Sequence, residues 1–162
     1  IYSGSAYPRL DIKLYEKVSD ALPEVSFISF GSENRCRKVK NRHTIPWLDK
    51  RELFTLLENC DVGFMPYDVR NPHNLHCVPL KLFEYFNLGL PVVSTALLNI
   101  KEFKPHVEIA FNSTECVTAI SKLLSLNQNP QAIEKRKEIA QRHSTQNMQD
   151  KLLDLLRCQD SE

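Results

Sequence analysis

Two charged side chains, Lys81 and Glu84, interrupt a segment of 11 residues that is otherwise typical of a buried helix. The segment PLKLFEYFNLG, from Pro79 to Gly89, carries large apolar residues nearly all round the helix, so we expect it to be packed on most sides. Buried charges need partners. Residues three apart share a helix face, and a cation in the first turn opposes the helix dipole unless an anion is also bound. The pattern therefore predicts a phosphate site at the helix start, with Lys81 beside the anion.

The residues around this segment indicate a helix followed at once by a buried strand. Pro79 suits the first helical position, where its missing N–H is not needed, and Gly89 suits the position just past the helix end. Residues 92–95, Val-Val-Ser-Thr, form a short β-branched run of the kind found in buried parallel strands. Ligands bind at the carboxyl ends of such strands. We therefore expect the preceding segment, 67–78, to be an irregular loop that lines the site.

The rest of the chain alternates between strands and helices, each with its own signal. An apolar repeat of helical spacing begins at Leu10, Asp49 and Glu52 have capping-box spacing, and Asn112 with Glu115 caps a further helix. The alternation predicts an α/β domain with one mostly parallel sheet of about six strands and helices on both faces. The predicted strands are 1–4, 25–30, one ending at 44–46, 62–65, 92–95 and 107–111; the predicted helices are 10–22, 49–60, 79–89, 112–124 and a helical tail over 130–157.

The composition argues against several classes of protein. The 162 residues are 42% hydrophobic and 25% charged, with a net charge of +1, which suits one soluble domain. We find no basic stripe for nucleic acid, no apolar run near the roughly eighteen residues of a membrane span, and no signal peptide. The cysteines are scattered without a CxxC pair, which indicates reduced thiols. His73, His76 and Cys77 lack the paired spacing of zinc ligands, so we expect no metal.

Several stretches, in order, resemble the second, donor-nucleotide-binding domain of the two-domain GT-B glycosyltransferases of the group 1, family 4-like type. They are residues 1–18, 44–67, 79–95 and the helical tail. The helix PLKLFEY is most similar to that of capsule and exopolysaccharide biosynthesis enzymes. The resemblance implies that residues 1–162 form a single Rossmann-like domain, one half of a GT-B fold. It also implies that an N-terminal acceptor domain is absent, so we interpret the chain as a fragment that is inactive alone.

The resemblance implies that the full-length protein transfers a sugar from a nucleoside diphosphate sugar to a glycan or lipid-linked acceptor in polysaccharide biosynthesis. A UDP- or GDP-sugar is the expected donor, and no other cofactor is expected. Lys81 and Arg9 are the catalytic candidates, because cations stabilise the leaving diphosphate. Glu84 matches the glutamate that accepts hydrogen bonds from both ribose hydroxyls. Two alternatives stay open: Lys81 and Glu84 as a plain intrahelical pair, and Arg9 in a solvated helical turn.

Backbone and base contacts follow from the same resemblance. Backbone N–H groups at the helix start would meet the diphosphate, small residues after the first strand would let the backbone approach it, and the end of the third strand would contact the base. His76 stands where many retaining members carry a second glutamate, and either bonds the sugar or is solvated. Trp47 either contacts the base or packs in the core or between domains. The full nucleotide-sugar-binding set is Gly4, Ser5, Ile45, Pro46, Trp47, His76, Val78, Leu80, Lys81 and Glu84.

Two other functions use the same residues differently. A GT-B-fold sugar-nucleotide epimerase would keep the diphosphate and ribose contacts for another reaction. A non-catalytic Rossmann-like interaction module would bind no nucleotide, and Lys81 and Glu84 would pair only with each other. For the glycosyltransferase we expect a cytoplasmic location, with peripheral contact at the inner face of the membrane through the missing domain as a further option.

Overall fold

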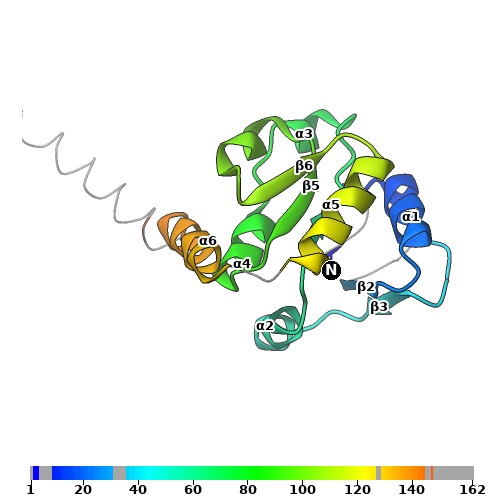
Figure 1. The fold of residues 1–162 in the computed structure, drawn as a ribbon, viewed down its shortest axis with the longest axis horizontal. Helices are drawn as coiled ribbons and strands as arrows, with labels where there is room; N and C mark the ends of the chain where they lie inside the picture. The colour runs from blue at the N-terminus through cyan, green and yellow to red at the C-terminus, as the bar shows by residue number, and fades with distance from the viewer. Residues whose placement is uncertain (1, 4–8, 31–35, 127–128, 145–146, 148–162) are drawn as a thin grey trace, which may run out of the picture.

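The structure is a computed structural model that describes residues 2–3, 9–30, 36–126, 129–144 and 147. Parallel strands and helices alternate along the chain, as predicted (Figure 1). The strands are β1 (Tyr2–Ser3), β2 (Phe27–Phe30), β3 (Arg42–Ile45), β4 (Gly63–Met65), β5 (Val92–Thr95) and β6 (Val107–Ala110). The helices are α1 (Ile12–Ala21), α2 (Lys50–Glu58), α3 (Pro72–Leu75), α4 (Leu80–Asn87), α5 (Ser113–Ser125) and α6 (Pro130–Arg142), with a 3-10 helix η1 (Leu98–Phe103).

The strands form two three-stranded parallel sheets, so the prediction of one continuous sheet of about six strands was wrong. The orders are β1–β2–β3 and β4–β5–β6. β1 and β4 lie in contact, yet the described residues form no ladder between them, because β1 has two residues and β4 three. The two sheets are joined further along by an antiparallel bridge between Leu10 and Tyr67. This bridge lies just beyond the carboxyl ends of β1 and β4.

The helix caps that the sequence predicts are present in the structure. The Asp49–Glu52 capping box makes both of its hydrogen bonds, and Asn112 accepts from the backbone N–H of Glu115. Gly89 follows the end of α4 with a φ of +74°, which an L side chain rarely adopts. Two bounds differ from the prediction. α1 begins at Ile12, after the cap Asp11, and α6 ends at Arg142, with His143 as its C-cap, short of the end predicted for the helical tail.

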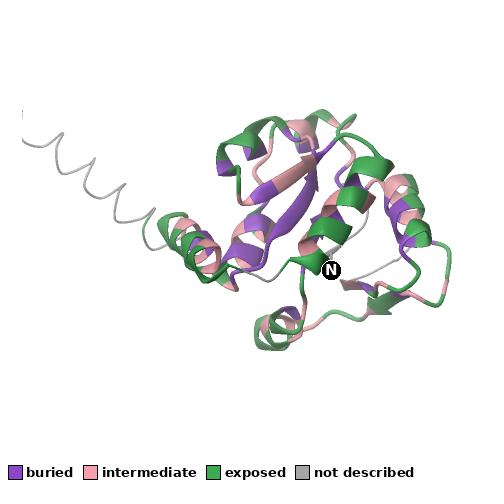
Figure 2. Ribbon diagram, viewed as in Figure 1, coloured by how far each residue is buried: buried purple, intermediate pink, exposed green. Residues whose placement is uncertain are grey.

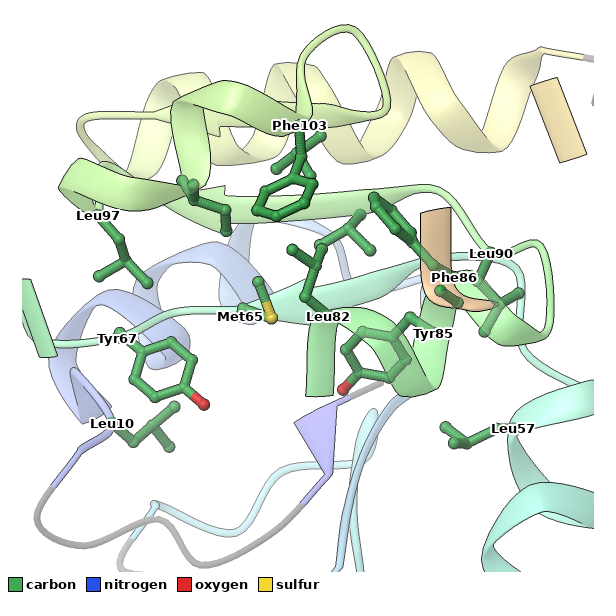
Figure 3. Close-up of a cluster of buried hydrophobic side chains, with 14 residues drawn as sticks. Leu10, Leu57, Met65, Tyr67, Leu82, Tyr85, Phe86, Leu90, Leu97 and Phe103 are labelled. Carbon is green, nitrogen blue, oxygen red and sulfur yellow. The ribbon is translucent and has the colours of Figure 1, made fainter. Parts of the chain in front are cut away.

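Two hydrophobic clusters cover the sheets from opposite faces. The first packs α4 onto β4 and β5 and includes Leu82, Tyr85 and Phe86 (Figure 3). The second lies under α1 and α5 and includes Tyr15 and Phe64. β5 is buried along its whole length, whereas the outer surfaces of α2 and α5 are exposed (Figure 2). Each cluster takes side chains from both sheets, so the split sheet still has a shared core.

Three further expectations at α4 and its preceding loop were wrong. Pro79 is the N-cap of α4 rather than its first helical residue. Leu80 is 78% exposed, so the helix is not packed at its first turn, although Leu82, Tyr85 and Phe86 are fully buried. The segment 67–78 contains the short helix α3, capped by Asn71 and opened by Pro72. An asparagine cap followed by proline also begins α6, so this signal could have predicted α3 from the sequence.

Candidate functional site

The N-terminus of α4 differs from that of the other α-helices. Asp or Asn side chains accept backbone N–H groups at the starts of the other five α-helices that the structure describes. At α4 the cap residue is Pro79, which makes no such hydrogen bond. The first N–H groups of a helix have no intrahelical acceptor and carry a partial positive charge. The start of α4 therefore offers donors suited to an anionic group.

Lys81, in the first turn of α4, is half-buried, and its charge responds to two neighbours. Burial lowers the pKa of the Lys81 ammonium, Glu84 raises this pKa, and the nearby Arg9 guanidinium lowers it. Arg9 also lowers the pKa of the Cys77 thiol, although burial keeps that pKa above its ordinary value. The structure thus brings Arg9, which comes from the turn before α1, close to the start of α4. Two cations held together in this way would both be stabilised by a bound anion.

The turn that carries Arg9 is fixed to the loop after β4. The backbone N–H of Asp68 donates to the carbonyl of Arg9 at 2.9 Å, and the N–H of Asp11 donates to the carbonyl of Pro66 at 2.9 Å. Between these two bonds lies the Leu10–Tyr67 bridge, whose side chains lie side by side in Figure 3. The contacts join the carboxyl edges of the two sheets at the place where parallel sheets bind ligands.

Two other side chains, which the sequence analysis missed, hold the loop from β5 and η1. Thr95 Oγ1, at the end of β5, donates to the carbonyl of Tyr67 at 2.9 Å. Asn99 Nδ2, in η1, donates to the carbonyl of His76 at 2.7 Å. His76 itself is exposed and forms the C-cap of α3. Nothing in the sequence distinguishes these anchors from other polar loop residues, because their partners lie 28 and 23 residues away.

The stretch predicted to contact the base follows β3 in the other sheet. Trp47 is 62% exposed, which excludes the alternative that it packs in the core of this domain. Pro46 is also exposed and Ile45 is half-buried. Ile45 lines an open groove of about 680 Å³ between the end of β3 and α2, together with Leu48 and others. The groove thus begins at the end of β3, two residues before the exposed Trp47.

The remaining predicted site residues lie in different parts of the domain. Val78 and Leu80 flank Pro79 at the start of α4, beside Lys81, and the role of their backbone N–H groups stays a prediction. Gly4 and Ser5 lie outside the described residues. The charges of Arg9 and Glu84 both shift the pKa of Lys81. Ile45 ends β3 in the other sheet, and Pro46 and Trp47 follow it.

Comparison with known families identifies the domain. A family model described as "Glycosyl transferase-like" matches residues 12–154, which is most of the chain. The chain belongs to this glycosyltransferase family. It is 28% identical over 151 residues to TuaH of Bacillus subtilis (strain 168), which is named as a teichuronic acid biosynthesis glycosyltransferase. That match covers 86% of the chain and 38% of TuaH.

The fold of the glycosyltransferase domain matches one part of a solved structure. WaaG, a glycosyltransferase involved in lipopolysaccharide biosynthesis, superimposes with a TM-score of 0.67 at 16% identity. The match covers 95% of this chain and 45% of WaaG, so the chain corresponds to about half of that GT-B protein. Within the described residues, none of the helices of the domain is long and apolar enough to cross a membrane.

Proposed function

We propose that this chain is the donor nucleotide-sugar-binding half of a glycosyltransferase that transfers a sugar to a glycan or lipid-linked acceptor in polysaccharide biosynthesis. Residues 1–162 would form the donor domain, and a second domain, outside this chain, would hold the acceptor. The observation that carries the proposal is the start of α4, where an uncapped helix N-terminus, a half-buried Lys81 and a neighbouring Arg9 meet. Family membership and the name of TuaH support the sugar chemistry and the pathway class.

In the proposed mechanism, the leaving diphosphate lies against the start of α4. The backbone N–H groups of Val78, Leu80 and Lys81 would donate to its oxygens, and Lys81 and Arg9 would offset the charge that grows as the bond to the sugar breaks. Such donors are arranged before the reaction begins, which is why they stabilise the transition state. Their charge is more effective where water is partly excluded, as the burial of Lys81 indicates. The isolated domain would bind the donor without turning it over.

Glu84 and the end of β3 would fix the nucleoside. Glu84 lies three residues after Lys81 on α4, so its two carboxylate oxygens can accept both ribose hydroxyls while Lys81 faces the phosphates. The base, of UDP or GDP, would lie against Ile45, Pro46 and the exposed ring of Trp47. Gly4, Ser5 and His76 complete the proposed donor site, His76 beside the sugar. No metal is required, because cations and N–H groups carry the diphosphate.

Calorimetric titration of the domain with UDP, GDP, ADP and CMP tests this function. We expect one nucleoside diphosphate to bind selectively, and Lys81→Ala and Glu84→Ala each to lose roughly 1.5–3 kcal/mol of binding free energy, as for hydrogen bonds to charged groups. That loss corresponds to an affinity lower by about ten- to 150-fold.

A second lysine–glutamate pair supplies the matched control. Lys137 and Glu134 are also three residues apart, on α6, and form an exposed ion pair of 3.0 Å. Lys137→Ala and Glu134→Ala should leave nucleotide affinity unchanged. A folded domain that binds none of the four nucleotides, or binds them equally well in the Lys81 and Glu84 variants, would contradict the proposed donor site and favour an interaction module.

A further inference from the structure

A buried asparagine, Asn74, connects three parts of the candidate site. It lies in α3, five residues before the cap of α4, and its side chain is fully buried. Its Nδ2 donates to the carbonyl of Arg9 and to the carbonyl of Asp68, both at 2.9 Å. Both partners are acceptors, so the amide can face them only with its NH₂ group. One side chain thus joins the Arg9 turn, the loop after β4 and the segment that leads into α4.

The hydrogen bonds of Asn74 connect the two segments that carry the cations of the site, Arg9 and Lys81. The Arg9 carbonyl is 65 residues from Asn74 in the chain, whereas Lys81 is only seven residues after Asn74. The Arg9 side chain is exposed, so little packing against the described residues holds it. What fixes the origin of this side chain is its own backbone, which is bound by Asn74 and by the N–H of Asp68. A small shift of that backbone would move the guanidinium away from α4.

Stability alone explains Asn74 poorly. Its Oδ1 is buried and has no hydrogen-bond partner among the described residues. An unpaired buried acceptor destabilises a protein by roughly 1–3 kcal/mol. That penalty offsets much of what the two Nδ2 hydrogen bonds contribute, at about 1 kcal/mol each. Residues retained at such a penalty are expected at functional sites.

We propose that Asn74 is a positioning residue, which holds the Arg9 turn against the segment before α4 so that Arg9 and Lys81 face the same bound diphosphate. The identity of the ligand rests on the proposed function, but the placement of Arg9 does not. Asn74 touches no reacting group itself. It acts through the Arg9 backbone, and its loss would separate the two cations without removing either.

The first test uses no nucleotide. The pKa of Lys81 is measured by NMR titration of its side chain in the wild type, Arg9→Ala, Asn74→Ala and the double variant. Because Arg9 lowers the Lys81 pKa, Arg9→Ala should raise it. Asn74→Ala should raise it in the same direction, and the double variant should match Arg9→Ala, since Asn74 acts through Arg9. An unchanged Lys81 pKa in folded Asn74→Ala would overturn the proposal.

Asn41 provides a control with the same chemistry away from the site. Its Nδ2 donates to three carbonyls, those of Ser19, Leu22 and Val25, at 2.8–3.3 Å. Asn41→Ala should destabilise the domain by an amount comparable to Asn74→Ala and leave the Lys81 pKa unchanged. Should Asn74→Ala fail to fold, Asn74→Ser keeps one donor and should raise the Lys81 pKa by less. A rise of the Lys81 pKa in Asn41→Ala as well would show a general loosening and overturn the proposal.

Binding of UDP or GDP then tests whether Asn74, through Arg9, affects nucleotide affinity. Asn74→Ala should weaken the preferred nucleoside diphosphate by about tenfold, or 1.4 kcal/mol, and Arg9→Ala should add little further loss in the double variant. Affinity for the corresponding nucleoside, which has no phosphate, should stay the same. Additive losses would contradict action through Arg9. A wild type that binds neither diphosphate would contradict the proposed function, while the Lys81 titration would still decide the role of Asn74.

Discussion

The two sheets contain three parallel strands each, but they differ in how they are covered. In β4–β5–β6, the strands β4 and β5 are buried at every residue. In β1–β2–β3, the outer strand β3 is buried only at Arg42, and His43 and Thr44 are exposed. Buried strands on both faces are typical of the middle of a parallel sheet, and partly exposed strands of its edge. The sheet β4–β5–β6 is therefore called the buried sheet, and β1–β2–β3 the open sheet.

This difference matches the division of the candidate site. The start of α4, with Lys81 and Glu84, lies on the buried sheet, and its preceding loop is held by Thr95, Asn99 and Asn74. Ile45, Pro46 and Trp47 follow the open sheet. Groups that stabilise a transition state must be placed closely before the reaction, whereas a base can be held by stacking that tolerates small shifts. On the proposed function, the diphosphate and ribose contacts would therefore lie with the buried sheet, and the base contact with the open sheet.

The largest expected effect is on stability, and it compares an aromatic residue beside the buried sheet with one beside the open sheet. Phe86, in α4, is fully buried, and Trp47 is 62% exposed. Phe86→Ala should lower the free energy of unfolding by about 3–5 kcal/mol, because it leaves a cavity in the first cluster. Trp47→Ala should change it by no more than about 0.5 kcal/mol, while nucleotide affinity falls. Urea unfolding followed by circular dichroism measures both. Equal destabilisation would contradict the distinction between a buried and an open sheet.

A smaller effect tests the extra layer that α6 adds to the buried sheet. Arg136, in α6, is buried, and its Nε donates at 2.7 Å to the carbonyl of Gly89 at the end of α4. Arg136→Met should reduce the free energy of unfolding by about 1.5–3 kcal/mol, as for a hydrogen bond to a charged group. Arg142, on the same helix, forms an exposed ion pair with Glu138 at 3.6 Å. Arg142→Met should therefore change stability by less than about 1 kcal/mol, and a larger loss there would indicate that the whole of α6, not one contact, supports the sheet.

The order of elements could be predicted from the sequence because each has a local signal. The Asp49–Glu52 box, Asn112 and Gly89 act within a few residues, and the structure has them in these roles. The split of the sheet could not be predicted, since it depends on how far β1 and β4 extend beside one another. The exposure of Leu80 was missed for a similar reason, because the spacing of apolar residues does not say what covers the first turn of a helix.

The candidate site likewise contains residues that the sequence predicts and residues that it does not. Lys81 and Glu84 stand out in the sequence, because charges in an apolar segment are unusual. Their neighbour Arg9 followed only from the family resemblance, and the structure places it near Lys81. Asn74 could not be identified, since its partner Arg9 is 65 residues away and nothing local requires an asparagine there. Residues that act through long-range hydrogen bonds become visible only once the loops are placed.

The smallest effect concerns the contact between the two sheets at alkaline pH. Cys36 and Cys116 lie in the second cluster, which includes Phe27 of the open sheet and Phe64 of the buried one. Burial raises the pKa of each thiol from its usual 9.0 to about 11. Between these values the unfolded chain loses protons that the folded protein keeps, so stability falls as pH rises from about 9 to 11.

We expect each thiol to reduce the free energy of unfolding by at most about 1.4 kcal/mol per pH unit over that range. Urea unfolding at a series of pH values from 8 to about 10.5 measures the slope, with a reductant present to keep the thiols free. Cys116→Ala removes one of the two groups and should make the slope shallower, while the raised pKa values of Cys60 and Cys77 leave part of the slope in place. A cooperative loss of both sheets would show that the second cluster joins them into one unit. Loss of β1–β2–β3 alone, seen by amide NMR signals, would show instead that the open sheet unfolds separately and that the two halves are only loosely connected.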